Sequence, residues 1–261
     1  IRIKELIDDE DSTIDDIADV ILIDPALAAT ILKLANSSFF NYPGKIDTVS
    51  KAVLVLGITE VYNLVIAYFT KEAFQSIHAN ADYLENFWSQ SVDCALLVKY
   101  LGIELRIPNA ERLFLLGLLH NIGELVIHQF VPAQLKACVS NDIAEPPWLK
   151  QQKILGFTYG DCSTELLKLW RLPYTLMEPI RFQDEEDFTL SSQESQLLYL
   201  AKRVMMKNSL YEEQPYSALI AVDKFEKFII DEELLNSAMN YCDLERLGIL
   251  AIPNPNAAMV Y

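Results

Sequence analysis

The chain has 261 residues, of which 51% are hydrophobic and only 8 are Gly, and its formal net charge at pH 7 is -16. A chain of this length and apolar content can bury a large core, as one big domain or as two packed lobes. The acidic balance repels phosphate backbones, so we expect no nucleic-acid partner bound over a broad surface. Acidic runs such as 8–11 and 184–187 are typical of solvated surface.

The cysteines and the start of the chain favour a cytoplasmic protein. Cys94, Cys138, Cys162 and Cys242 form no CxxC pair and lie in apolar, helix-like contexts, which predicts reduced, buried thiols. We expect no membrane partner, because no apolar run approaches the roughly 18 residues of a spanning helix. The opening IRIKE is no signal peptide, and the missing initiator Met suggests a fragment of a longer protein.

Residues 1–76 predict a lobe of four helices. The segment 12–15 (STID) is typical of a capping box, and Asp24 with Pro25 forms a second helix start as cap and first helical residue. Gly57 is a natural stop for the third helix, and Thr59 is placed to cap the fourth. The four helices are expected over about 14–22, 25–36, 48–56 and 59–68.

Residues 77–261 predict a larger helical core with a C-terminal helical extension. Gly102 is placed to stop its first helix, Asn109 to cap the second, and Pro146-Pro147 to form a loop. Helices are expected over about 87–101, 113–127, 161–170, 174–182, 192–206, 217–229 and 232–241, with a short one from 132 and an irregular tail from 253. Hairpin signals are absent. The sequence therefore predicts an all-α, multi-helix fold in which the N-terminal lobe packs on the core.

The stretch 113–127 is the most apolar of these helices, and it holds the polar pair His120-Asn121 at its centre. A helix that is apolar all round is normally buried, and buried polar groups need partners or a functional role. Two interpretations follow for the pair: a satisfied hydrogen-bond network, or a pocket that binds a small ligand or nucleotide.

The residues around this pair resemble a known family. The segment 117–123 (GLLHNIG) is similar to the GLLHDIG segment of the HD superfamily of metal-dependent phosphohydrolases, where adjacent His and Asp bind the catalytic metal; here the Asp position is Asn121. Three segments in order resemble the HDOD branch: 24–37, like its DPaLaa…LaNS signature, 52–58, like its Ai…LG helix, and 87–123, extended by 155–157 and 170–173. The resemblance covers roughly residues 3–185. It implies an HD-like fold that generally lacks the metal ligands.

The resemblance also locates the positions of the lost metal ligands. Gln90 lies where the hydrolases have a first ligand His, Asn121 replaces the Asp of the pair, and later His positions fall on Tyr159 and on Gln183-Asp184. The chain has only 3 His, too few imidazole ligands for a site of two metal ions. We therefore expect no metal, no cofactor and no catalytic residue.

Further residues of the matched segments are candidates for the pocket or the motif. Asn36 and Ser37 end a helix, where local capping is the alternative interpretation, and both Trp residues are typical of a core. The further candidates are Asn36, Ser37, Trp88, Gly123, Trp170 and Pro173.

The resemblance implies a regulatory or scaffolding module of a bacterial cytoplasm, since HDOD domains occur in bacterial signalling proteins. We expect it to act without catalysis, by binding a signalling protein or a small ligand. The alternative is a metal-dependent phosphohydrolase acting on cyclic dinucleotides or nucleotides. The replacement of its metal-ligand residues argues against this alternative. The chain has no GxSxG, P-loop, Rossmann or HExxH motif that would indicate another enzyme class.

Overall fold

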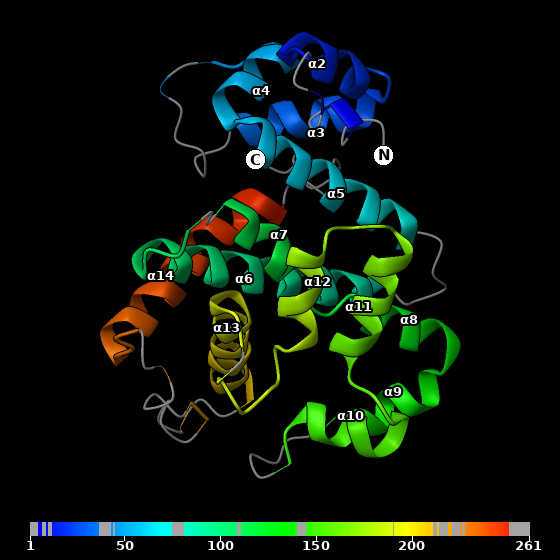
Figure 1. The fold of residues 1–261 in the computed structure, drawn as a ribbon, viewed down its shortest axis with the longest axis vertical. Helices are drawn as coiled ribbons and strands as arrows, with labels where there is room; N and C mark the ends of the chain where they lie inside the picture. The colour runs from blue at the N-terminus through cyan, green and yellow to red at the C-terminus, as the bar shows by residue number, and fades with distance from the viewer. Residues whose placement is uncertain are drawn as a thin grey trace. The chain divides into compact units, whose positions relative to one another are not determined.

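The fold is given by a computed structural model (Figure 1). It describes residues 5–6, 9, 12–36, 43, 45–74, 81–108, 111–139, 145–189, 191–210, 213, 219–220, 225 and 228–250. The regular elements in these ranges are all α-helices, which confirms the predicted all-α class. The chain divides into two compact units, one made of Ile1–Gln75 with Asp243–Tyr261 and the other of Ser76–Cys242.

The helices of the first unit begin at local sequence signals. They are α2 (Ile14–Leu22), α3 (Pro25–Ala35), α4 (Val49–Leu56) and α5 (Ile58–Phe74). Thr13 caps α2 through a capping box with Asp16, whose carboxylate accepts from the Thr13 backbone N–H at 2.8 Å. Asp24 Oδ1 accepts from the backbone N–H of Leu27 at 3.1 Å at the start of α3. Asp24 is therefore confirmed as a cap, whereas the capping box predicted at 12–15 lies one residue later, between Thr13 and Asp16.

The junction between α4 and α5 differs from the prediction. Gly57 ends α4 with a φ of 84°, a conformation that favours glycine. Because α5 begins directly at Ile58, Thr59 lies inside the first turn of α5 and does not cap it. The carbonyl of Gly57 accepts from the backbone N–H of Val61 at 3.1 Å, so Gly57 itself takes the place before the helix.

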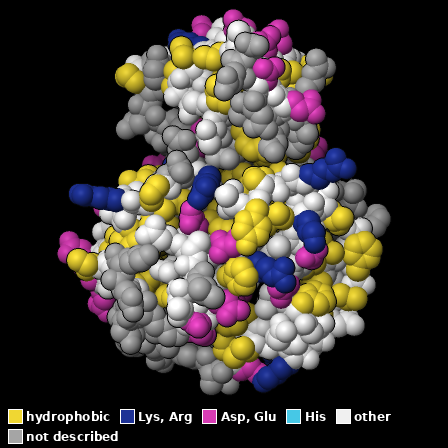
Figure 2. All heavy atoms as spheres, in the orientation of Figure 1, with side chains coloured by type: hydrophobic (Ala, Val, Ile, Leu, Met, Phe, Trp, Pro, Cys, Tyr) yellow, Lys and Arg dark blue, Asp and Glu magenta, His cyan; other side chains and the backbone are white. Residues whose placement is uncertain are grey.

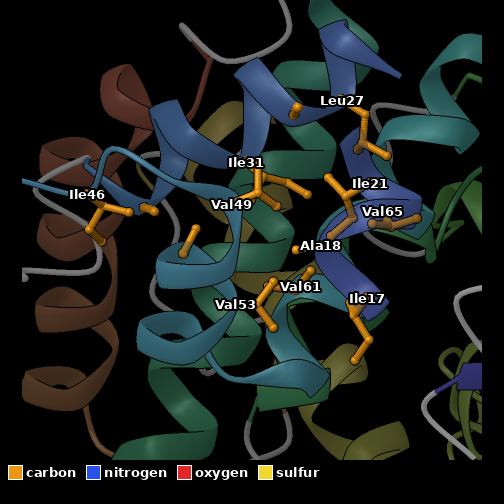
Figure 3. Close-up of a cluster of buried hydrophobic side chains, with 13 residues drawn as sticks. Ile17, Ala18, Ile21, Leu27, Ile31, Ile46, Val49, Val53, Val61 and Val65 are labelled. Atoms are coloured by element: carbon orange, nitrogen blue, oxygen red, sulfur yellow. The ribbon is translucent and has the colours of Figure 1, made fainter. Parts of the chain in front are cut away.

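The first unit has an acidic exterior and an apolar core. Asp15, Asp16 and Asp19 are exposed on α2, and Figure 2 shows acidic side chains gathered on this unit. Inside, aliphatic side chains from the four helices point toward one another (Figure 3). Burying one Ile or Val side chain stabilises a fold by roughly 1.5–3 kcal/mol relative to exposing it. The labelled side chains that are at most 2% exposed are Ile17, Ala18, Ile21, Leu27, Ile31, Ile46, Val53, Val61 and Val65.

The second unit holds the later helices. They are α6 (Ala81–Glu104), α7 (Glu111–Leu119), α8 (Gly123–Phe130), α9 (Pro132–Cys138), α10 (Pro147–Leu155), α11 (Tyr159–Leu169), α12 (Tyr174–Arg181), α13 (Gln193–Leu210) and α14 (Glu232–Leu250). The last helix starts in this unit and ends among residues counted with the first. The four cysteines are free, and Cys162 is half-buried whereas the other three are buried.

Several helix predictions in this unit need correction. The single helix expected over 113–127 is interrupted and forms α7 and α8. Pro147 starts α10 instead of lying in a loop, because its fixed φ suits the first helical position. The positions 219–220, 225 and 228–229 of the helix expected over 217–229 are not helical. The predicted cap Asn109 and the tail from residue 253 lie outside the described residues.

Close packing of α6 against α7 depends on glycine. The helix α6 continues through Gly102, which was predicted to stop it, and ends at Glu104. A Cβ atom at Gly102 would collide with the Leu113 side chain, and one at Gly117 would lie 2.5 Å from Ala95 Cα. Glycine serves here for close approach of two helices, and this tertiary contact overrides its local tendency to end a helix.

Among the described residues, one helical stretch is long and apolar enough to cross a membrane, which corrects the expectation that no apolar run has this length. The stretch Arg112–Phe130 has 19 residues and a mean hydropathy of 1.3, and 67% of it is buried inside the fold. The core helix of a folded domain passes the same test. A helix pair in the described residues, Val49–Leu56 with Ile58–Thr70, passes only jointly and is bent by 113°.

Gly117→Ala tests the α6–α7 contact, because the contact and helix propensity predict changes of opposite sign in the free energy of unfolding. Helix propensity alone would make the change stabilising by about 1 kcal/mol. We expect instead a loss of about 1–3 kcal/mol, because the backbone of Ala95 cannot move aside as a flexible side chain would. Urea unfolding followed by circular dichroism measures the difference. A variant as stable as the wild type would show that the two helices have room to separate.

Candidate functional site

The centre of the candidate site is the turn that separates α7 from α8. Residues 120–122 form this turn, and the His120 side chain is 6% exposed. His120 Nδ1 lies 2.6 Å from the carbonyl oxygen of Gly117. A carbonyl can only accept, so Nδ1 carries the ring proton and Nε2 keeps its lone pair. Burial lowers the pKa of His120 to about 3, and the positive charge of Lys202 acts in the same direction. The imidazole is therefore neutral at pH 7.

The backbone carbonyl oxygen of His120 lies just after the end of α7, and its hydrogen-bond donors come from later elements of the chain. Gln183 Nε2 donates to it at 2.9 Å, and Ser163 Oγ lies 3.2 Å from it. The same Ser163 oxygen accepts from the backbone N–H of Gly123 at 2.8 Å. A Cβ atom at Gly123 would lie 2.6 Å from Ser163 N, so only glycine lets α8 start this close to α11. The turn is thus fastened to α11 and to the residues after α12.

Asn121 faces a carboxylate and not an open pocket. Its Nδ2 donates to Glu124 Oε2 at 2.5 Å, and Tyr83 Oη donates to Glu124 Oε1 at 2.8 Å. Burial raises the pKa of Glu124, while the two donated hydrogen bonds lower it. The Tyr83 ring also stacks on His128 with 4.2 Å between ring centroids. The position that would carry a metal-binding Asp in the HD superfamily therefore holds an amide already bound to a carboxylate.

A pair of buried cations lies on α13. Lys202 Nζ is 2.5 Å from Asp184 Oδ1, and the two side chains are only 15% and 11% exposed. Burial lowers the pKa of Lys202, and the charge of Asp184 raises it. Part of the acidic run 184–187, predicted as solvated surface, therefore belongs to a largely buried ion pair. The reason is that α13 brings a Lys to it from 18 residues away.

Arg203 is sandwiched between aromatic rings. Its guanidinium carbon lies 3.1 Å from the centroid of Tyr199 and 4.3 Å from that of Trp148. Its Nη2 also donates to Glu186 Oε1 at 2.9 Å. A desolvated cation between ring faces is attracted by both ring quadrupoles. Arg203 therefore fastens α10 to α13.

The remaining predicted residues lie in different surroundings. Gln90 is exposed on α6, and Trp88 is half-buried beside it. Tyr159 belongs to a small apolar cluster with Ile127, Leu135 and Cys138. Trp170 and Pro173 flank the turn between α11 and α12, as the residue after one helix and the residue before the next.

Asn36 makes local hydrogen bonds at the end of α3, as its alternative interpretation predicted. Its Nδ2 donates to the carbonyl oxygens of Leu32 and Ile46 at 2.8 and 2.7 Å, and its Oδ1 accepts from Ile46 N at 2.9 Å. The end of α3 is thereby tied to the chain before α4. Ser37 lies outside the described residues.

The residues present do not fit the metal ions that the HD superfamily resemblance implies. The described residues contain no group of three or more His, Cys, Asp or Glu placed to hold a metal ion. Gln90 points to solvent, and Asn121 is bound to Glu124. Gln183 offers its N–H group to His120, and Asp184 already pairs with Lys202. No metal-dependent step is therefore derived from this site.

Sequence reasoning missed Tyr83, Glu124, Lys202 and Arg203. Glu124 could have been found, because it follows Asn121 by three residues at the start of a helix, a spacing at which side chains meet. The other three come from α6 and α13, and no sequence signal connects them with His120.

Comparison with known proteins supports one family. The family model described as HDOD domain matches residues 1–186. A Treponema pallidum (strain Nichols) protein described as "Uncharacterized protein" is 26% identical over 188 residues, which are 70% of this chain and 36% of that protein. The chain thus spans about a third of the curated relative it matches.

Solved structures are similar over nearly the whole chain. A "Putative phosphohydrolase" from Shewanella amazonensis SB2B is 24% identical with a TM-score of 0.74, over 97% of this chain and 91% of that one. A "Putative signal transduction protein" from Marinobacter aquaeolei VT8 is 25% identical with a TM-score of 0.73, over 96% and 57%. An HDOD domain protein with unknown function from Geobacter sulfurreducens is 20% identical with a TM-score of 0.70, over 97% and 90%. The HDOD-type fold is therefore confirmed.

Asn121→Asp tests the amide–carboxylate contact. The new carboxylate faces Glu124, whose pKa burial already raises, so both acids should have folded pKa values above their unfolded ones. The penalty is then full above the folded pKa values and fades as pH falls toward the unfolded ones. We expect a loss of about 1–3 kcal/mol at pH 7 and a smaller loss near pH 5. Denaturant unfolding at both pH values measures it.

The matched control is the double variant Asn121→Asp with Glu124→Gln, which restores one amide facing one carboxylate. It should recover most of the lost stability. If the double variant is less stable than Asn121→Asp alone, the contact between the two side chains does not cause the loss.

Arg203→Lys tests the aromatic sandwich. Lys keeps the positive charge but loses the planar group that stacks on both rings, so we expect a loss of about 1–3 kcal/mol. The control is Arg181→Lys, the same change at an exposed position of α12, which should leave stability unchanged. Equal effects of the two substitutions in thermal unfolding would show that the stacking adds no stability.

Proposed function

The chain belongs to the HDOD domain family, and on this premise we propose that it is a non-catalytic signal-transduction module of a bacterial cytoplasm. It acts by binding a signalling protein or a small ligand, and it does not hydrolyse phosphoesters. The bound partner, by favouring one arrangement of the module, passes a signal to the rest of a larger protein.

The hydrogen bond from Asn121 to Glu124 carries the non-catalytic part of the proposal. A metal-dependent hydrolase needs several anionic or imidazole ligands around its metal. At the pair position the second ligand is a neutral amide, and its N–H group is directed to a carboxylate. The side chains of Gln183 and Asp184 are also engaged by protein partners. These contacts stabilise a folded unit and leave a metal ion with too few ligands.

The relatives support a regulatory role in a larger protein. The signal-transduction name belongs to the Marinobacter protein, of which this chain covers 57%. The phosphohydrolase name belongs to a Shewanella protein that is 24% identical, a likeness that carries the fold alone. A module that occurs within longer chains is suited to relay a signal between neighbouring parts.

The surface supports a protein partner over a nucleic-acid partner. On the face of the second unit drawn in Figure 2, Lys and Arg side chains are interspersed with Asp and Glu side chains. Large apolar side chains are also exposed on this unit, among them Phe130 at 72% and Leu169 at 79%. Together with the net charge of -16, these features oppose the phosphate contacts that nucleic-acid binding requires and offer apolar area to a protein.

Metal retention and hydrolysis by the wild-type chain test the proposal together. The protein is incubated with Mn²⁺, desalted and analysed for metal, then offered bis(p-nitrophenyl) phosphate and a cyclic dinucleotide. We expect no stoichiometric Mn²⁺ and no turnover, because the ligand positions hold neutral or already paired groups. An active HD phosphohydrolase treated in the same way is the positive control. One or two retained equivalents, with turnover that His120→Ala abolishes, would mean that the chain is an enzyme.

A further inference from the structure

The guanidinium group of Arg203 lies at the centre of a site made by two aromatic rings and a carboxylate. Its carbon is 3.1 Å from the ring centroid of Tyr199 and 4.3 Å from that of Trp148. Its Nη2 donates to Glu186 Oε1 at 2.9 Å, and its Nη1 donates to the backbone carbonyl oxygen of Tyr199 at 3.2 Å. Ring faces and carboxylates are the groups with which proteins bind organic cations. We call Trp148, Tyr199 and Glu186 the cation site.

The walls of the cation site are held by contacts that do not involve Arg203. Tyr199 Oη donates to Glu186 Oε2 at 2.9 Å, so the hydroxyl fixes the carboxylate through its other oxygen. The Tyr199 ring also meets the ring of Phe188 edge to face, with 4.9 Å between centroids. Trp148 is buried in the first turn of α10. The site should therefore keep its shape when the Arg203 side chain is shortened.

The cation site has a side that faces water. The Glu186 side chain is 58% exposed, whereas the Arg203 side chain is 2% exposed. A small cation could therefore reach the site past the carboxylate. Of the two neighbouring helices, α10 packs more closely against α9 than against α13, so its attachment to α13 relies on side chains such as Arg203.

We infer that Trp148, Tyr199 and Glu186 form a binding site for a guanidinium cation, which Arg203 fills from within the same chain. A ligand attached to the chain is present at its site at an effective concentration that a dilute free cation does not match. The wild type is therefore saturated, and an added cation can enter only when the Arg203 side chain is shortened or displaced. The inference goes beyond the proposed function and does not depend on it.

Arg203→Ala tests the inference by thermal unfolding with and without about 20 mM guanidinium chloride, far below the molar range in which this salt denatures proteins. Without the added cation, the variant should melt below the wild type, because the two rings lose the group between them. We expect guanidinium to raise the Tm of the variant by on the order of 2–4 °C and to leave the wild type unchanged. Urea, which has a similar planar shape but no charge, and NaCl at the same ionic strength should change neither protein.

Three further variants separate the cation site from general effects of the salt. Arg203→Ala with Glu186→Gln lacks the carboxylate and should lose most of the response. Arg181→Ala removes an exposed arginine of α12 and should not respond. Arg203→Leu keeps the first carbons of the side chain but ends before the guanidinium group, so it serves if Arg203→Ala does not fold, and it should respond in the same way.

A variant that is unfolded on its own should regain its helical circular dichroism when guanidinium is added. The inference is overturned if neither Arg203→Ala nor Arg203→Leu responds to guanidinium, in Tm or in refolding. It is also overturned if urea stabilises these variants as much as guanidinium does, since the site would then not recognise a cation.

Discussion

The carbonyl oxygen of His120 is the group on which the arrangement of the second unit depends. It follows the end of α7 in a buried place, where an unpaired carbonyl would cost about as much as a lost hydrogen bond. Its donors come from Gln183 and Ser163, which are 63 and 43 residues further along the chain. Satisfying one backbone group therefore requires α11 and the segment after α12 to lie against the start of α8. The missing Cβ atom of Gly123 makes this approach sterically feasible.

The site contains two carboxylates that are largely withdrawn from water, those of Glu124 and Asp184, and protein groups stabilise each of them in a different way. Around Glu124, the carboxylate accepts from an amide and a phenol, so neutral donors stabilise it. Around Asp184, a lysine supplies a full opposite charge. Both arrangements consist of protein groups alone.

Local signals in the sequence located some helix starts, but they failed where a tertiary contact decides, as at Gly102, which lies inside α6. The caps at Thr13 and Asp24 act within three residues, so the sequence alone located the second and placed the first within one residue. Apolar periodicity correctly indicated that 113–127 is buried. It could not show that the helix is interrupted at residue 120, because the hydrogen-bond donors that satisfy the His120 carbonyl lie far along the chain. The acidic run 184–187 looked solvated because nothing near it in sequence announces Lys202. Gln90 was placed by resemblance on a ligand position, yet its side chain is exposed, since matching a motif does not determine the rotational phase of a helix.

The stack of Trp148, Arg203 and Tyr199 also gives the protein an optical property. A phenol and an indole separated by a single guanidinium are close enough for excitation absorbed by Tyr199 to reach Trp148. The emission of Trp148 then depends on whether α10 stays attached to α13. The chain has 3 Trp, so replacing Trp88 and Trp170 would leave one intrinsic fluorophore at this junction. Detachment of α10, whether spontaneous or caused by a bound partner, would then change the wavelength and intensity of the Trp148 fluorescence without any added label.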